Sequence, residues 1–433
     1  MKAKRVAVTG IGIVSPLGHD TESTWQALLA GKSGIAPIAN FDASAFPTTI
    51  AAEVKQFDAS RFIDDKKMLK STVPFTRFAL AAAEQALEQA GIRPNAHDSH
   101  RWGAVVGSGM MTAEFSYWER FAESFAETGQ LDIRKLGQNA HECYRSEDFG
   151  KTLSNSGLAL LLKRYGIKGY ANSVHTACAS GGQALGLGMH VIRRGIADVI
   201  VAGGFDSMIN PIGVSSFCLL GALSTYNNTP TTASRPFDLT RNGFVLGEGA
   251  AFLVLESWEH ATARGASILA ELAGEGNSLS SYRITDSHPS GDGAIQAIEG
   301  ALKSAGLTPD AVDYINAHGT STKMNDLSES NAIKAVFESR LGSLPVSSTK
   351  GQTGHLIAAA GAIEAGFSVL AIRDQMIPPT ANLTTPDPDC QLDYVTDGPR
   401  HARVETVMSN SFGFGGSNSC LIFRKPTTRE VVP

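Results

Sequence analysis

Short apolar segments alternate along the chain with longer amphipathic segments, a pattern typical of strands followed by helices. The run 6–14 predicts a buried strand, and the periodic segment 74–90 predicts a helix that begins at a proline and ends before Gly91. Further strands are predicted at 101–107, 197–203, 250–256, 268–274, 312–317 and 420–423. This alternation predicts an α/β protein with mainly parallel central sheets that are covered by helices.

Part of the pattern occurs twice. The sequence Ala-Leu-x-x-Ala-Gly-Ile-x-Pro at 86–94 recurs as Ala-Leu-x-x-Ala-Gly-Leu-x-Pro at 301–309. Residues 8–12 resemble residues 272–276 more weakly. The alternative explanation is chance, because alanine and a glycine at the end of a helix are both common.

The repeat predicts two duplicated α/β halves, residues 1–258 and 259–433. The first half carries a long excursion, residues 110–165, before its next strand-to-helix turn. Excursions of this kind often cover a site or build an interface.

Composition narrows the class of protein. At 433 residues, with 42% hydrophobic and 18% charged residues, the chain is typical of a large globular protein. A formal net charge of −5 gives no reason to expect a nucleic acid or a membrane surface as partner. No apolar run approaches the roughly 18 residues that a membrane span needs. The five cysteines are scattered without a Cys-x-x-Cys pair, which predicts a reducing, cytoplasmic location and no zinc or other metal site.

Cys178 stands where an apolar, β-branched segment runs into small residues and then into a helical pattern. The sequence therefore predicts a strand-to-helix turn with the thiol at the start of the helix. Unpaired N–H groups there favour a thiolate, which is the form of cysteine that attacks carbonyl groups. The alternative is a buried cysteine that only fills the core.

Two histidines and a lysine follow in the second half. His318 comes directly after a predicted strand, and the carboxyl end of such a strand faces the crevice where α/β proteins bind ligands. The nearby Thr320 and Thr322 hydroxyls suit an amide-bearing chain, although a helix cap explains them as well. Lys350 and His355 are separated by two glycines, so both can face one cavity.

A glycine-rich loop at 410–418 leaves backbone N–H groups exposed, as an oxyanion hole requires. Together these residues favour a thioester on Cys178 and an enolate that two histidines stabilise. A Cys–His–Asn hydrolase, or a plain acyltransferase, is the competing use of the same residue types. A hydrolase leaves one histidine and Lys350 unexplained.

Six blocks of sequence resemble one family almost from end to end. They are VAVTGIGIVSPLG at 6–18, HTACASGG at 175–182, RPFDLTRNGFVLGEGA at 235–250, NAHGTST at 316–322, SSTKGQTGHLIAAAG at 347–361 and SNSFGFGGSN at 409–418. The chain resembles the elongating β-ketoacyl-[acyl-carrier-protein] synthases of the thiolase-like superfamily. The resemblance implies a thiolase-like fold of two duplicated halves in a layered αβαβα architecture, and a homodimer.

The resemblance also implies an activity, which is decarboxylative condensation of an acyl chain on Cys178 with a malonyl group on a carrier protein. His318 and His355 are then expected to hold the malonyl thioester. Lys350 is expected to pair with Glu329 and orient His318. No resident cofactor is expected, because phosphopantetheine arrives on the carrier.

Further roles follow from the same resemblance. The N–H groups of Cys178 and Phe412 are expected to form the oxyanion hole, with Phe412 as a gate. Substrate contacts are expected from Thr320, Thr322, Thr285, Met110, Phe414 and Gly415. The basic residues Lys66, Lys67 and Lys70 are expected to meet the acidic acyl carrier protein, although a solvated helix start explains such lysines equally well.

The chain departs from the family at a few positions. Arg283 stands where histidine is frequent, Asn242 replaces an aspartate, and residues 125–150 are longer and more polar. These changes keep a specialised polyketide or fatty-acid pathway open as the alternative. A non-catalytic partner subunit is disfavoured, because such partners usually lack the cysteine that Cys178 supplies.

Overall fold

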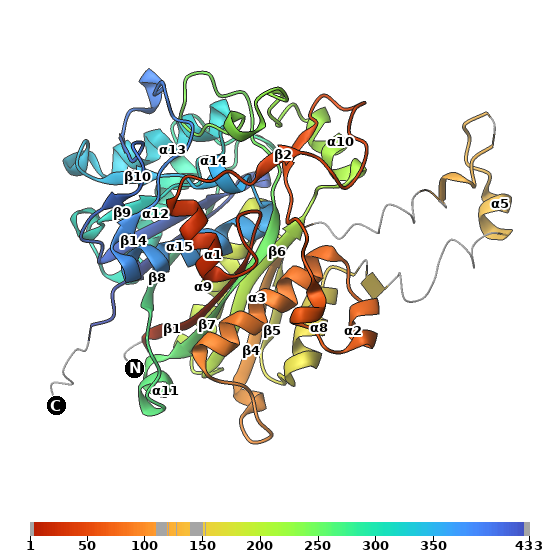
Figure 1. Ribbon diagram of the computed structural model, residues 1–433. Helices are drawn as coiled ribbons and strands as arrows, with labels where there is room; N and C mark the ends of the chain where they lie inside the picture. Colours follow the sequence, from red (N-terminus) through yellow and green to blue (C-terminus); the bar gives the residue numbers. More distant parts are fainter. Residues whose placement is uncertain are drawn as a thin grey trace.

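The structure is a computed structural model that describes residues 4–109, 119, 121–126, 128–138, 150–151 and 153–427. Its described part contains an eleven-stranded central sheet (Figure 1). The first half contributes β1 (Val6–Val14), β4 (Trp102–Ser108), β5 (Ala171–Val174), β6 (Val199–Ser207) and β7 (Glu248–Ser257). The second half contributes β8 (Ala270–Leu279), β9 (Tyr314–Asn316), β10 (Pro345–Ser347), β12 (Asp393–Tyr394), β14 (Thr406–Phe412) and β15 (Ser417–Arg424).

The order of the strands reveals the duplication. From one edge to the other it reads β12-β10-β9-β14-β15-β8-β1-β7-β6-β4-β5. Apart from β12, each half contributes five strands in the same order, and the halves meet where β1 and β8 pair antiparallel. The predicted boundary at residues 258/259 falls between β7 and β8.

The expectation of mainly parallel sheets is wrong. The strand β4 is parallel to β5 and β6, but β7 is antiparallel to both β6 and β1. The second half repeats this arrangement, with β9 parallel to β10 and β14, and β15 antiparallel to β14 and β8. A tight turn joins β14 to β15, and so short a connection allows only antiparallel pairing.

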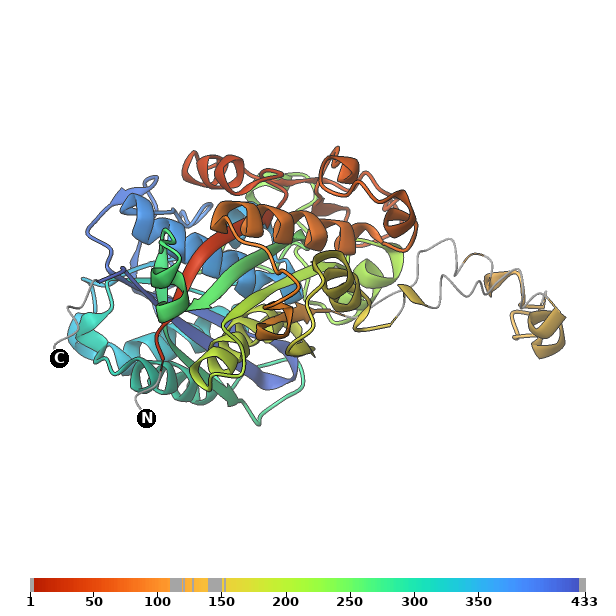
Figure 2. The same cartoon turned by 90° about the horizontal axis from the view of Figure 1, so that it is seen from below.

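The helices confirm the predicted layers. The first half has α1 (Thr21–Leu29), α2 (Lys66–Lys70), α3 (Pro74–Ala90), α5 (Ile133–Gln138), α8 (Ser156–Tyr165), α9 (Ser180–Arg193) and α10 (Pro211–Leu219), and α11 (Trp258–Ala263) spans the predicted boundary. The second half has α12 (Asp292–Ala305), α13 (Lys323–Val336), α14 (Lys350–Thr353) and α15 (Ala360–Asp374). Helices α9 and α15 pack on each other and contact strands of both halves. Helix α3 covers β1 and β7 from outside, and α12 covers β8 and β15 (Figure 2). The pair α9 and α15 lies between the two halves of the sheet, and α3 and α12 cover the other faces of those halves, which gives the layered αβαβα architecture.

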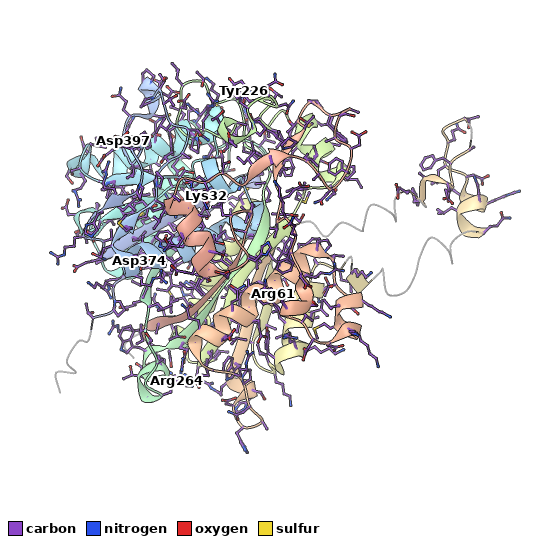
Figure 3. All side chains as sticks on the ribbon, in the orientation of Figure 1. Lys32, Arg61, Tyr226, Arg264, Asp374 and Asp397 are labelled. Atoms are coloured by element: carbon purple, nitrogen blue, oxygen red, sulfur yellow. The ribbon has the colours of Figure 1, made fainter. Side chains whose placement is uncertain are left out.

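Smaller elements complete the described part. Two short ribbons are β2 (Ile35–Pro37) with β3 (Ile50–Ala52), and β11 (Met376–Ile377) with β13 (Arg400–His401). Charged side chains such as Lys32, Arg61 and Asp397 lie at the surface (Figure 3). Among the described residues no helix is both long and apolar enough to cross a membrane.

The predicted excursion, residues 110–165, is described only in part. Helix α5 lies apart from the layered body, whereas α8 packs against α3 and β4 (Figure 1). Met110 lies outside the described residues, so its expected place in the acyl pocket stays a prediction. The role of the excursion also stays a prediction.

Each half brings its first strand unusually close to an alanine-rich helix. A Cβ atom added to Gly12 of β1 would lie 1.8 Å from the carbonyl oxygen of Ala82 in α3. A Cβ atom added to Gly276 of β8 would lie 2.1 Å from the carbonyl oxygen of Ala297 in α12. The weak similarity of residues 8–12 to residues 272–276 therefore reflects the same close contact in both halves.

We expect Gly12→Ala to lower the free energy of unfolding by about 1–3 kcal/mol, because the new methyl group meets a backbone oxygen that cannot move freely. Gly276→Ala should have a similar effect in the second half. Gly137→Ala is the control, since no atom lies within 4 Å of that added Cβ atom. Urea unfolding measures all three variants. Equal stability of Gly12→Ala and Gly137→Ala would contradict the packing argument.

Candidate active site

Cys178 lies in a strained turn between β5 and α9. Ala177 has a positive φ of 49°, and residues Ala177–Ala179 form one turn of 3₁₀ helix that leads into α9. The Ser180 hydroxyl holds the turn by accepting the N–H of Thr176 at 2.8 Å. A non-glycine residue at positive φ is uncommon and persists only where its surroundings stabilise it. The predicted strand-to-helix turn is therefore confirmed, and Cys178 in it is 3% exposed.

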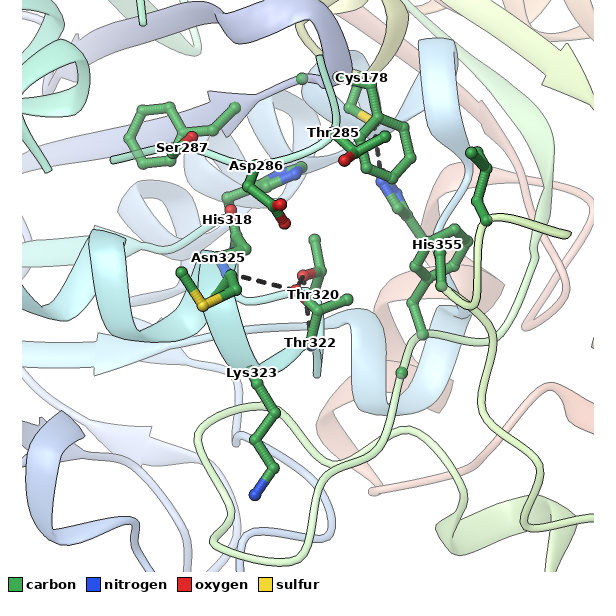
Figure 4. Close-up of a pocket in the computed structure, with 18 of the residues that line it drawn as sticks. Cys178, Thr285, Asp286, Ser287, His318, Thr320, Thr322, Lys323, Asn325 and His355 are labelled. Carbon is green, nitrogen blue, oxygen red and sulfur yellow. Dashed lines mark hydrogen bonds between the residues drawn. The ribbon is translucent and has the colours of Figure 1, made fainter. Parts of the chain in front are cut away.

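A cavity of about 320 Å³ opens next to this thiol and gathers residues that are far apart in the sequence (Figure 4). Cys178, His318 and His355 lie around one end of the cavity, whereas Thr322 and Lys323 lie farther from the thiol. The donor atoms of the cysteine and the two histidines lie within 4.8 Å of one another. The structure thus brings the predicted nucleophile and both predicted histidines to one site.

His355 is the direct partner of the thiol. Its Nε2 atom lies 3.0 Å from Sγ of Cys178, and its ring meets that of Phe244 edge to face at 5.2 Å. The backbone N–H of His355 donates to the carbonyl oxygen of Val245 at 2.7 Å. Burial and the charge of Lys350 hold the pKa of His355 well below its ordinary value. The imidazole is therefore neutral and can accept a proton from the thiol.

The thiol itself differs from the sequence-based expectation. Burial raises the pKa of Cys178 to about 12, although the charge of Lys350 and the N–H group of Phe414 act in the opposite direction. The expected resting thiolate is wrong, because the start of a helix stabilises the anion less than burial destabilises it. Cys178 rests as a neutral thiol beside a neutral base.

Lys350 determines which ring nitrogen of His318 carries the proton. Its Nζ atom lies 3.2 Å from Nδ1 of His318 and donates to the carbonyl oxygen of the same residue at 2.6 Å. Because an ammonium group can only donate, Nδ1 must accept and Nε2 must carry the ring proton. Burial, the charge of Lys350 and His355 hold the pKa of His318 well below its ordinary value. His318 therefore presents a neutral N–H donor.

The expected pairing of Lys350 with Glu329 is wrong. Lys350 forms a short, fully buried ion pair with Glu364 on α15. Glu329 instead accepts the backbone N–H groups of His318 and Gly319, each at 2.8 Å, and the side-chain amide of Asn410. Because these donors occupy its oxygens, Glu329 holds the backbone of His318 while Glu364 holds the lysine.

The two phenylalanines of the glycine-rich loop, Phe412 and Phe414, do not lie where the resemblance implied. Phe412 ends β14, is paired with Asn418, and places its ring 6.0 Å from that of His318. The N–H group beside the thiol belongs to Phe414, whose half-buried ring stacks on Phe217. A Cβ atom on Gly413 would lie 3.1 Å from the Cys178 nitrogen, so a glycine is needed for this approach.

Of the other predicted substrate contacts, the three threonines line the cavity and one glycine does not. Thr320 and Thr322 lie with their hydroxyl oxygens 2.9 Å apart, and the exposed Thr285 lies on the same cavity. Gly415 is absent from the described lining, and its N–H donates to the carbonyl oxygen of Ile284 at 2.7 Å. The N–H group of Gly415 therefore holds the loop before Thr285, and its expected substrate contact stays a prediction.

One group of metal-ligand type occurs among the described residues, and it consists of Cys178, His318 and His355. The ammonium of Lys350 lies 3.2 Å from Nδ1 of His318, and its charge disfavours a cation at this group.

Sequence reasoning missed Glu364, Phe244 and the role of the Phe414 N–H group. Glu364 had a visible signal, because it is the one charged residue in the stretch 357–372, which is otherwise rich in small and apolar residues. Phe244 and the Phe414 N–H had none, since their roles depend on distances across the fold.

The layered fold and the cysteine–histidine–histidine site define a thiolase-like enzyme that carries acyl groups on a thiol. Family models described as "Beta-ketoacyl synthase, N-terminal domain" and "Beta-ketoacyl synthase, C-terminal domain" match residues 3–261 and 269–384. The chain belongs to the β-ketoacyl synthase family.

Named relatives cover nearly the whole chain. The 3-oxoacyl-[acyl-carrier-protein] synthase 2 of Coxiella burnetii is 43% identical over 98% of this chain and 99% of its own. That of Vibrio cholerae is 40% identical over 98% of this chain and 100% of its own. Among solved structures, a type II polyketide ketosynthase in complex with its acyl-carrier protein is 35% identical. The match has a TM-score of 0.86 and covers 98% of this chain and 100% of that one.

Because Cys178 rests as a thiol, we expect its alkylation by iodoacetamide to accelerate about tenfold per pH unit from pH 7 to 9. Mass spectrometry of peptides follows Cys178 beside the half-buried Cys218, which serves as the internal control. A rate at Cys178 that is already constant below pH 7 would indicate a resting thiolate and contradict the effect of burial.

Proposed function

We propose that this chain condenses an acyl group carried on Cys178 with malonyl-[acyl-carrier-protein] in fatty-acid elongation. The products are 3-oxoacyl-[acyl-carrier-protein] and carbon dioxide. One observation carries the proposal: a thiol and two neutral, buried imidazoles converge on one cavity, and Lys350 holds one imidazole as an N–H donor. The names of the full-length relatives describe the same activity.

The first step loads the acyl group. Sγ of Cys178 attacks the carbonyl carbon of the incoming thioester while Nε2 of His355, 3.0 Å away, accepts the thiol proton. The N–H groups of Cys178 and Phe414 hold the oxyanion. Phe414 replaces Phe412 in this proposal, because its N–H lies beside the sulfur. Collapse expels the pantetheine thiolate, which takes a proton from solvent, while Nε2 of His355 keeps the proton that it received from Cys178.

The second step forms the carbon–carbon bond. The malonyl thioester oxygen accepts N–H bonds from His318 and His355, so the electrons released by loss of carbon dioxide form a stabilised enolate. The enolate carbon attacks the acyl carbonyl on Cys178, and the sulfur leaves as a thiolate. The sulfur takes back the proton held by His355, 3.0 Å away, which restores the neutral thiol and the neutral imidazole.

The cavity provides a route for the pantetheine arm. Thr320, Thr322 and Thr285 line it and can hold the amides of the arm. Phosphopantetheine thus arrives on the carrier, and the proposed reaction needs no resident cofactor. The half-buried ring of Phe414 stands at the thiol end, where we assign it the gating role that was expected of Phe412.

Two macromolecular contacts complete the proposal. Lys66, Lys67 and Lys70 on α2 are exposed, as a docking surface for an acidic carrier protein requires. The strand β5 is one edge of the described sheet, and such an edge favours pairing with a second copy in a homodimer.

A nucleophilic thiol also favours a location in the reducing cytoplasm. The ranges 1–258 and 259–433 remain our proposed domains.

We expect Cys178→Ala to abolish the acyl adduct that intact-mass spectrometry detects on the wild-type protein. His318→Ala should slow decarboxylation of malonyl carrier about 10²–10³-fold while loading continues, because its N–H bond is made to the malonyl group alone. His355→Ala should impair both steps. Cys218→Ala is the matched control and should load normally. An adduct that persists in Cys178→Ala would overturn the assignment.

Reversal of the α2 charges, Lys66→Glu with Lys67→Glu, should raise KM for carrier-bound substrates about tenfold or more and leave kcat nearly unchanged. Short pantetheine thioesters without a carrier should react as before. Lys303→Glu, on the exposed face of α12, is the control. An unchanged KM in the double variant would place the carrier elsewhere.

A specialised pathway remains the second candidate, because a solved type II polyketide ketosynthase is 35% identical to this chain. Condensation assays with a series of carrier-bound acyl chains of increasing length distinguish the two functions. Fatty-acid elongation predicts condensation of saturated acyl chains, whereas a polyketide pathway predicts preference for chains that keep their keto groups.

A further inference from the structure

The turn that carries Cys178 has a second copy in the other half of the protein. Ala177 before Cys178 has a φ of 49°, and Ile357 before Ala358 has a φ of 44°. Each turn is one 3₁₀ turn, Ala177–Ala179 or Ile357–Ala359, which leads into a central helix, α9 or α15. By position in the duplicated fold, Ala358 is therefore the counterpart of Cys178.

The histidines follow the same correspondence. His175 stands three residues before Cys178, and His355 stands three residues before Ala358. Only His355 reaches the thiol, whereas Nδ1 of His175 lies 3.0 Å from the carbonyl oxygen of Ser108. The second turn has thus lost the nucleophile and kept a histidine that serves the first turn.

The two turns differ in what faces their backbone N–H group. At the first turn the neighbouring residue is Gly413, which leaves the Cys178 N–H open to the cavity. At the second turn Oδ2 of Asp206 accepts the Ala358 N–H at 3.0 Å. Asp206 lies near the end of β6, and Gly413 follows β14, which holds the same place in the second half.

The residues around Asp206 bury its carboxylate and donate hydrogen bonds to it. The residue is 4% exposed, and its carboxylate also accepts the N–H of Ser207. A Cβ atom added to Gly109 would lie 2.2 Å from Oδ2 of Asp206. The residue that follows β4 must therefore be glycine to leave room for the carboxylate. Burial raises the pKa of Asp206 to about 7, although both N–H groups lower it. Its burial is costly without the hydrogen bonds it makes.

We infer that Asp206 fills a second, disused copy of the oxyanion-binding turn and thereby positions His355 for the reaction at Cys178. The inference rests on the proposed function of His355. Asp206 is a positioning residue, because it touches the turn and not the reacting atoms. Without an acceptor, the buried Ala358 N–H would be unpaired and the strained φ of Ile357 would lose its support. His355, two residues before Ile357, would then shift from the thiol.

Two variants separate the hydrogen bond from the charge. Asp206→Asn and Asp206→Ala both remove the negative charge, but only the asparagine keeps an oxygen that can accept the Ala358 N–H. We expect Asp206→Ala to lower kcat for malonyl-carrier decarboxylation about 10–100-fold with KM nearly unchanged, since a displacement near 1 Å has effects of this size. Asp206→Asn should stay within about fivefold of wild type.

Sodium formate offers a further readout, because a small carboxylate can occupy the space left in Asp206→Ala and accept the same N–H. Formate should restore part of kcat in that variant and leave wild type unchanged. Glu271→Gln is the structural control. Glu271 is a buried carboxylate that pairs with Arg5 and Arg424, so its loss should lower Tm and not kcat.

Iodoacetamide alkylation of Cys178 at pH 8 tests the turn independently of condensation. Asp206→Ala should react about tenfold more slowly than Asp206→Asn, because only the alanine variant displaces His355. Equal alkylation rates, equal kcat values of the two variants, or a folded Asp206→Ala with the kcat of wild type would overturn the inference. A wild-type protein that does not decarboxylate malonyl carrier would instead refute the proposed function, and the alkylation rates would still decide the role of Asp206.

Discussion

The active site depends on one buried cation. The ammonium of Lys350 lies between Nδ1 of His318 and the carboxylate of Glu364, out of contact with water. It can only donate hydrogen bonds, so it forces the ring proton of His318 onto Nε2. Its charge also opposes protonation of His355. A buried ammonium without Glu364 would be costly, so this carboxylate on α15 is part of the site although it touches no substrate.

Duplication explains how such a site arises from one chain. Two equivalent turns begin the two central helices, and the αβαβα layers hold them side by side. One turn carries Cys178 and an open N–H group, whereas the other carries Ala358 and the carboxylate of Asp206. The function comes from this asymmetry, because the filled turn can be rigid while the open one receives the substrate. His355 links them, since it belongs to the second turn and acts on the thiol of the first.

The protonation state of Cys178 shows why local sequence reasoning was insufficient. A helix start next to a cysteine correctly predicted the position of the thiol, and also predicted an anion. In the fold the same N–H groups are present, but burial outweighs them and raises the pKa. A neutral thiol beside a neutral imidazole needs no separated charges at rest, and the proton moves only when a carbonyl group arrives. The same limit applies to Lys350, whose expected partner Glu329 is taken by backbone N–H groups.

The sequence alone determined the two halves, the helix at 74–90, the turn at Cys178 and the identity of both histidines and the lysine, because periodicity and motif spacing are local properties of a chain. Only the tertiary structure decided the mixed strand directions, the pairing of Lys350 with Glu364, the N–H group of Phe414 beside the thiol and the carboxylate of Asp206 at the second turn. These contacts join residues 14 to 236 positions apart, from Lys350–Glu364 to Cys178–Phe414. Hydrogen bonding and desolvation depend on distance and burial in three dimensions, and the spacing of residues along the chain predicts neither the distance nor the burial.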